Sequence, residues 1–65
     1  MIDLQITPGP YIDRALCVVP PDYDIRPWLA EVLHYTDWWV ERTDWRAVND
    51  RLVITRVTLF RIKNP

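Results

Sequence analysis

Four tryptophans in a chain of 65 residues limit how this protein can fold. The indole ring buries more area than any other side chain, and its N–H group needs a hydrogen-bond partner. A globule this small cannot shelter four such rings from solvent, so we expect part of the indole surface to contact another molecule. Three of the four rings lie within eight consecutive positions, as Trp38, Trp39 and Trp45.

The chain is long enough for one small domain, predicted over residues 1–65. A domain of about 60 residues buries only roughly 60% of the surface that its unfolded chain exposes, so its stability is marginal. Cys17 is the only cysteine and His34 the only histidine, which excludes an internal disulfide and a cysteine–histidine zinc site. We expect no cofactor, and we expect stability to come from packing of large aromatics together with oligomerisation.

The charges nearly balance, with 8 basic and 9 acidic side chains and a formal net charge of −1. This total gives no electrostatic reason to expect binding to nucleic acid or to an anionic membrane. No segment has the pattern of a signal peptide or approaches the ~18 apolar residues of a transmembrane helix. A single free thiol suits a reducing compartment, and the cytoplasm is the predicted location.

Two strands are predicted in the first third of the chain. Apolar and polar side chains alternate over residues 2–7, which is typical of a half-buried strand. The Pro-Gly-Pro segment at residues 8–10 ends this strand in a turn. A continuous apolar run predicts the second strand over residues 14–19, central in the sheet and covered on both faces, and it ends at Pro20.

One helix is predicted over residues 25–36. Its apolar residues recur at i, i+3, i+4 and i+7 spacing, which presents one stripe to a sheet. Either Asp22 or Asp24 is expected to cap its N-terminus, and Pro27 is tolerated in a first turn. The stripe consists of Ile25, Trp28, Leu29, Val32, Leu33 and Thr36.

Residues 37–48 fit two interpretations. As a strand, the segment pairs through an Asn49-Asp50 turn with the β-prone residues 51–62. We favour a strand over residues 38–48, because tryptophan forms strands better than helices and because the hairpin register separates apolar from charged side chains. As a helix, the segment would place on one face Trp38, Arg42, Trp45 and Val48.

The hairpin register predicts which rings face the core. Trp39 and Trp45 share the inner, mostly apolar face, whereas Trp38 points outward beside Arg61. The expected facing pairs are Ala47/Leu52, Trp45/Ile54, Thr43/Arg56, Glu41/Thr58 and Trp39/Phe60. The predicted fold class is therefore α+β, a small antiparallel sheet of three or four strands in the chain order ββαββ, packed on one helix.

The polar residues do not form a catalytic constellation. We interpret His34 as a surface histidine, Cys17 as a buried structural thiol, and the Asp22/Asp24 pair as helix capping. The mixed charges between residues 37 and 51 are typical of a solvated, partly ion-paired face. A chain with one glycine cannot build a glycine-rich phosphate loop. We therefore predict that the protein is not an enzyme and holds no metal.

The composition instead favours a binding surface. Seven of the 8 cations are arginine, and tryptophan, tyrosine and arginine are enriched at interface hot spots. We expect a small protein-binding module, such as a regulator, an inhibitor or an accessory subunit, whose partner is another protein, with a homodimer as one option. The predicted interface residues are Trp38, Arg61, Tyr35, Arg42, Arg46 and Tyr11.

Two other functions stay open. One is binding of single-stranded nucleic acid, in which aromatics on a sheet stack on bases and arginines hold phosphates, although the 9 acidic residues argue against it. The other is a homo-oligomeric structural protein. The long strand at 51–62 would invite pairing with a second copy if it lies at an edge of the sheet.

Overall fold

The computed structural model describes residues 2–63, which form four strands and one helix in the order ββαββ. The predicted α+β class and element order are confirmed, while Met1, Asn64 and Pro65 of the predicted domain lie outside the described residues. The elements are β1 (Leu4–Thr7), β2 (Ile12–Val18), α1 (Arg26–Tyr35), β3 (Trp39–Val48) and β4 (Arg51–Ile62).

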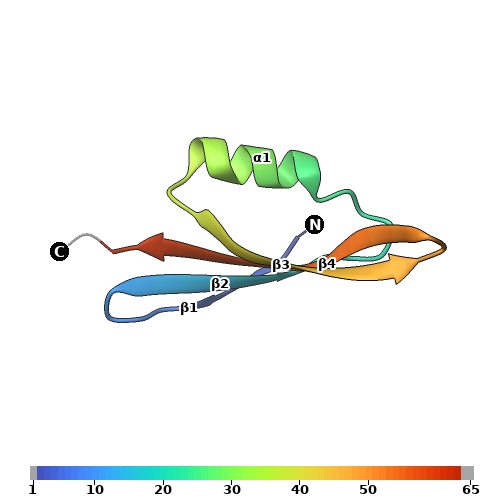
Figure 1. The fold of residues 1–65 in the computed structure, drawn as a ribbon. Coiled ribbons are helices and arrows are strands. Elements are labelled where there is room, and N and C mark those ends of the chain that lie inside the picture. The colour runs from blue at the N-terminus through green and yellow to red at the C-terminus, as the bar shows by residue number, and fades with distance from the viewer. Residues whose placement is uncertain (1, 64–65) are drawn as a thin grey trace.

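All neighbouring strands are antiparallel, and their order in the sheet is β1-β2-β4-β3. The connection through α1 carries the chain past β2 to the far edge, and β4 then folds back between β2 and β3 (Figure 1). Residues 56–60 of β4 therefore have a strand on each side. The middle of the long last strand is therefore not an edge that could pair with a second copy.

The sheet is covered on one face only. The helix lies over one face, and none of the described elements lies over the other (Figure 1). β2 is central as predicted, but the prediction that both of its faces are covered is wrong: Ala15 and Cys17 are buried, whereas Arg14 and Val18 are exposed. We call the two sides the helix face and the open face.

The turn between β3 and β4 confirms the hairpin and excludes the helical interpretation of residues 37–48. Asn49 and Asp50 have φ angles of 49° and 63°, so both are left-handed. Two consecutive left-handed residues define a type I′ turn, whose twist matches that of the flanking strands. Asn and Asp tolerate this conformation better than most residues other than glycine.

Each strand of this hairpin contains one irregularity that changes which side chains share a face. Facing pairs Trp45/Ile54 and Trp39/Phe60 are as predicted, but Thr43 pairs with Val57 rather than with Arg56. An extra residue lies in β4 at Thr55, and another lies in β3 at Glu41, so Arg42 rather than Glu41 faces Thr58. Because side chains alternate along a strand, each insertion moves the residues beyond it to the opposite face.

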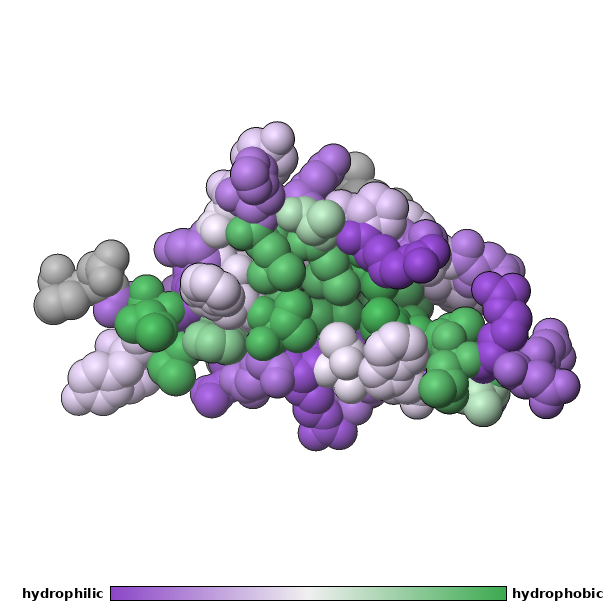
Figure 2. All heavy atoms as spheres, turned by 45° about the horizontal axis from the view of Figure 1, so that its top comes forward, coloured by the Kyte–Doolittle hydropathy of each residue, from purple (hydrophilic) through white to green (hydrophobic). Residues whose placement is uncertain are grey.

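A small apolar core lies between the sheet and the helix. Leu59, Val57 and Cys17 are the largest side chains that are completely buried. From α1, the side chains of Trp28, Leu29 and Val32 pack against this core, although none of the helix residues is fully buried. Apolar side chains remain visible in the middle of this side of the molecule (Figure 2). The buried core consists of Ala15, Cys17, Val19, Ile25, Trp38, Val57 and Leu59.

The helix spans Arg26–Tyr35, within the predicted range, and its N-cap position is Ile25. Ile25 is buried and provides no side-chain cap, so the prediction that an aspartate occupies the cap is wrong. Asp24 instead accepts a hydrogen bond from the backbone N–H of Arg26 at 3.1 Å. The apolar contact of Ile25 with the core takes the place of a polar cap at the start of the helix.

Candidate functional site

The structure divides the four tryptophans between interior and surface. Trp38 is only 6% exposed and belongs to the core, and Trp28 is half-buried against it. Trp39 and Trp45 are 62% and 55% exposed. The predicted faces of Trp38 and Trp39 are therefore wrong, because the inserted residue Glu41 turns Trp39 away from the core. Trp45 lies on the predicted face, opposite Ile54, but its ring is largely exposed there.

Trp38 takes part in a polar cluster on the helix face. The Arg61 guanidinium carbon lies 4.4 Å from the centroid of the Trp38 ring, so the two residues are neighbours as predicted, although on the helix face. Arg61 Nε donates to Asp13 Oδ2 at 3.0 Å, and Lys63 Nζ lies 3.1 Å from Asp13 Oδ1. Burial raises the pKa of the Asp13 carboxyl, but hydrogen bonds from Lys63, Arg61 and the Gly9 N–H outweigh it and lower the pKa. Through Asp13, this cluster joins β2 to the end of β4 and to the turn between β1 and β2.

The open face carries two neighbouring aromatic side chains. Trp39 on β3 pairs with Phe60 on β4, and Phe60 pairs in turn with Arg14 on β2. Phe60 is half-buried and Trp39 mostly exposed, so two aromatic residues are neighbours across the strands on this face, next to a cation. The adjacent row across the sheet consists of Gln5, Leu16, Thr58 and Arg42.

Charge is unevenly distributed between the two sides of the molecule. Strand alternation places five arginines and Asp44 on the open face, and the carboxylates of Glu41 and Asp3 lie beside them. This face is therefore positive, although the whole chain has a charge of −1. Two of these arginines form exposed ion pairs, Arg14 Nε with Glu41 Oε1 at 3.1 Å and Arg42 Nη2 with Asp44 Oδ1 at 2.7 Å. The five arginines are Arg14, Arg42, Arg46, Arg51 and Arg56, and the carboxylates are those of Asp3, Glu41 and Asp44.

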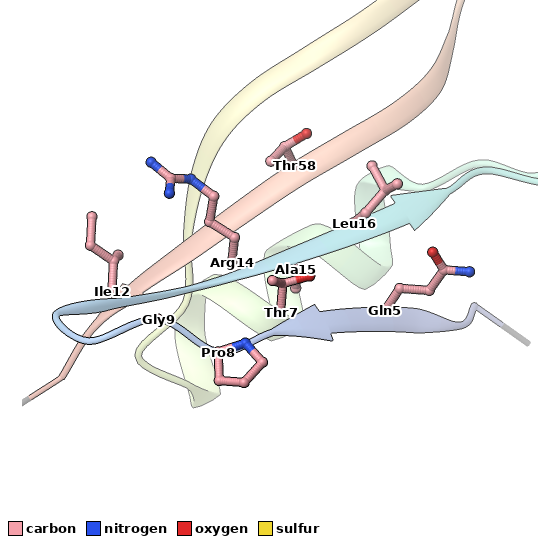
Figure 3. A pocket seen from close by; sticks show the side chains of 9 residues that line it. All are labelled: Gln5, Thr7, Pro8, Gly9, Ile12, Arg14, Ala15, Leu16 and Thr58. Carbon is pink, nitrogen blue, oxygen red and sulfur yellow. The ribbon is translucent and has the colours of Figure 1, made fainter.

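A shallow hollow of about 310 Å³ opens on this face beside β1 and β2 (Figure 3). Ile12, Arg14 and Leu16 project from β2 on the same side of the sheet, next to Thr58 of β4 (Figure 3). Position 9 is at the turn end of the hollow. A Cβ at this position would collide with the carbonyl oxygen of Ile12, so only glycine fits. The full lining consists of Gln5, Thr7, Pro8, Gly9, Ile12, Arg14, Ala15, Leu16 and Thr58.

The structure brings together only some of the predicted interface residues. Arg42 and Arg46 lie on the open face, whereas Trp38 and Arg61 lie on the helix face. Tyr35 is exposed at the end of α1, with its ring edge-on to His34 at 4.5 Å. Tyr11 is exposed in the turn between β1 and β2, where its carbonyl oxygen accepts a hydrogen bond from Lys63 N at 2.9 Å. These two tyrosines are therefore not part of one surface with the arginines.

Sequence reasoning missed three members of the open face: Trp39, Phe60 and Arg14. Arg14 could have been found, because it alternates with buried residues on either side in β2. Trp39 and Phe60 could not, because strict alternation assigns both rings to the inner face. Only the two inserted residues move them outward.

The side chains of Cys17, His34 and Asp24 lie in different parts of the fold. Cys17 is completely buried, and burial together with the charge of Asp3 raises the pKa of its thiol. His34 is exposed on α1. Asp24 binds the Arg26 guanidinium at 2.8 Å, and this hydrogen bond, with that from the Arg26 backbone N–H, lowers the pKa of Asp24 to about 2.

Residues 2–63 contain neither a candidate metal site nor a helix that could span a membrane. Residues 2–63 contain no group of three or more histidine, cysteine or acidic side chains positioned to hold a metal ion. The helix in this range is too short and too polar to cross a membrane. No protein-family model, curated protein or solved structure matches this chain.

Proposed function

We propose that this chain is a small, non-enzymatic protein-binding module, a regulator, inhibitor or accessory subunit, that covers its partner with the open face of its sheet. The observation that carries the proposal is the pair Trp39 and Phe60 beside Arg14, on a face that none of the described elements covers. The anchor is therefore Trp39 rather than the buried Trp38.

The surface area of the molecule supports this proposal. A folded monomer of 7.8 kDa is expected to expose roughly 4,400 Å². The chain exposes 5412 Å², in an elongated shape of 46 × 20 × 17 Å. The excess of about 1,000 Å² is close to the ~800 Å² that each partner buries in an interface of standard size. An isolated chain of this shape exposes as much extra surface as one protein interface would cover.

The residue types on the open face also suit a protein partner. Tryptophan and arginine are the types most enriched at energetic hot spots, and both occur here beside half-buried apolar side chains. Trp39, Phe60 and Leu16 supply apolar area, while Arg14 and Arg42 supply directional hydrogen bonds at its margin.

A site-specific photocrosslink in the native host tests the proposal. A benzophenone side chain replaces Val18, which is exposed on the open face, and in a matched variant it replaces Glu31, which is exposed on α1. We expect irradiation to join the first variant, and not the second, to one discrete protein, and we expect Trp39→Ala to abolish that product. Equal products from both positions would contradict the proposal.

A second candidate function is binding of single-stranded nucleic acid. Aromatic rings flanked by arginines on an uncovered sheet are a stacking platform for bases, and Arg46, Arg51 and Arg56 have no carboxylate within ion-pair distance among residues 2–63. A crosslinked product of the Val18 variant that is sensitive to nuclease would support this function. The affinity of the chain for single-stranded nucleic acid would then fall steeply as the salt concentration rises.

Self-association as a structural homo-oligomer is the third candidate. β4 is internal along residues 56–60. β3 is an edge strand whose outer side has no strand partner among residues 2–63, and this edge supports self-association. Sedimentation at two concentrations tests it. The cytoplasm remains the proposed location, on the ground that a lone buried thiol suits a reducing compartment.

A further inference from the structure

Building on the proposed function, we infer that the partner presents an acidic segment to the open face, with one carboxylate docked in the hollow beside Arg14. Five arginines face three carboxylates on this side, and six of the chain's nine acidic residues lie elsewhere. The net charge of the open face is thus opposite in sign to that of the whole chain. Complementary potential across an interface favours a partner that is negative where it makes contact.

The lining of the hollow suits a carboxylate on an aliphatic stem. The side chains of Ile12 and Leu16 form an apolar part, and Arg14 is the only charged residue in the lining. Gln5 and Thr58 supply polar groups at its border. A glutamate or aspartate side chain could lay its methylene groups on the apolar part and reach the Arg14 guanidinium. Arginine binds a carboxylate through two parallel hydrogen bonds.

Arg14 can exchange its present partner at little cost. It is joined to Glu41 by a single Nε–Oε1 contact of 3.1 Å, and the side chains are 57% and 39% exposed. Exposed ion pairs of this kind contribute roughly 0–1 kcal/mol. Glu41 is also the inserted residue of β3, outside the regular pairing with β4. A partner's carboxylate can therefore replace Glu41 without disturbing the sheet.

A second copy of this chain is a poorer occupant. Stacking two open faces would bring two positive surfaces together, which is unfavourable. The helix face of another copy is acidic and has the right charge. In such a pair, however, the second copy's open face and the first copy's helix face would stay unoccupied. Such a head-to-tail contact repeats without closing and produces filaments rather than a defined complex.

The test uses the intact chain and a 12-residue peptide of alternating glutamate and leucine, followed by intrinsic tryptophan fluorescence. We expect saturable binding, a change in emission that is lost in Trp39→Ala, and affinity at least tenfold weaker in Arg14→Gln. Arg26→Gln is the matched control, because Arg26 is also an exposed, ion-paired arginine but lies on α1. It should bind as the wild type does.

Three results would overturn the inference. They are equal binding of a peptide with lysine in place of glutamate, stronger binding of a 12-nucleotide oligothymidine, and unchanged affinity in Arg14→Gln. The proposed function has a separate outcome. If the Val18 photocrosslink joins a protein through a segment that is not rich in aspartate and glutamate, the protein-binding function stands and the acidic partner is wrong.

Discussion

Trp38 and Trp39 are neighbours in the chain, yet one is 6% exposed and the other 62%. Trp38 lies on the helix face, where Arg61 stacks on its ring and Asp13 holds Arg61. Trp39 lies on the open face, where its cross-strand neighbour is Phe60 and most of its ring is open to solvent. The same residue type is therefore structural on one face and available for binding on the other.

The charges of the two faces differ in the same way. On the helix face, one buried carboxylate is shared by Arg61 and Lys63, so breaking the cluster would leave a charge in a poorly solvated site. On the open face, the pairs Arg14–Glu41 and Arg42–Asp44 are exposed. Exposed pairs add little to stability, and they can be exchanged for the charges of a partner.

Replacing the two adjacent tryptophans is the strongest test of this comparison. Trp38→Ala should lower the free energy of unfolding by about 3–5 kcal/mol, because it removes a buried ring from a small core. Trp39→Ala should change it by less than about 1 kcal/mol, because the ring is mostly exposed. Urea denaturation followed by circular dichroism measures both. Equal losses in the two variants would contradict the assignment of the rings to opposite faces.

Gly9 belongs to both faces, because its N–H donates to Asp13 and its backbone lines the hollow. Gly9→Ala should cost about 1–3 kcal/mol, since the new methyl group must displace the Ile12 carbonyl. Thermal denaturation measures the loss. Thr7→Ala is a suitable control, because Thr7 also lines the hollow but is exposed. A Gly9→Ala protein as stable as the wild type would show that the turn has room to relax.

Acid should destabilise the protein through two carboxylates, those of Asp13 and Asp24. The pKa values of Asp13 and Asp24 are both lowered in the folded chain, that of Asp24 to about 2. Each contribution to stability is complete above the unfolded pKa of about 3.9 and is lost as the pH falls through the folded pKa. Unfolding midpoints between pH 5 and pH 2 should therefore decrease.

Salt separates these two contributions. In 1 M NaCl the part that is due to Asp24 should become small, because its pair with Arg26 is exposed and screened. The part that is due to Asp13 should persist and should disappear in Asp13→Asn. If the acid sensitivity of Asp13→Asn equals that of the wild type at high salt, the buried cluster does not control it.

The turn that connects β3 and β4 belongs to neither face. Substitutions in this turn should change the stability of the protein least. Asp50→Gly should stabilise the protein by up to about 1 kcal/mol, because Asp50 has a φ of 63° that glycine adopts without strain. Asp50→Ala is the matched variant, and it should be less stable than the glycine variant. A destabilising glycine would mean that the Asp50 side chain makes a contact that matters more than its backbone strain.

Much of the secondary structure could be predicted from local pattern. The apolar spacing of residues 25–36 indicates the helix, and Asn49-Asp50 between two β-prone segments indicates the hairpin. The buried state of Cys17 follows from its position in a continuous apolar run. These predictions depend on neighbours in the chain, and the structure confirms them.

The open face could be predicted only in part. The predicted interface residues Arg42 and Arg46 do lie there, but Trp38, which is also a predicted interface residue, is buried. The error has one physical origin, because Glu41 and Thr55 each add a residue to one strand without a local signal such as glycine. A side-chain period of two reverses the face of every later residue when one position is added.

The sequence by itself determined the elements of this protein, the turn that closes its second hairpin and the excess of indole surface over what so short a chain can bury. Those properties follow from side-chain periodicity, backbone preferences and volume, which act over a few residues or over composition. Only the tertiary structure decided that β4 lies inside the sheet, that the helix covers one face, and that Trp39 rather than Trp38 faces solvent. These outcomes depend on which strands pair and in which register. Local sequence patterns do not predict them, because the pairing energies arise between segments that are distant in the chain.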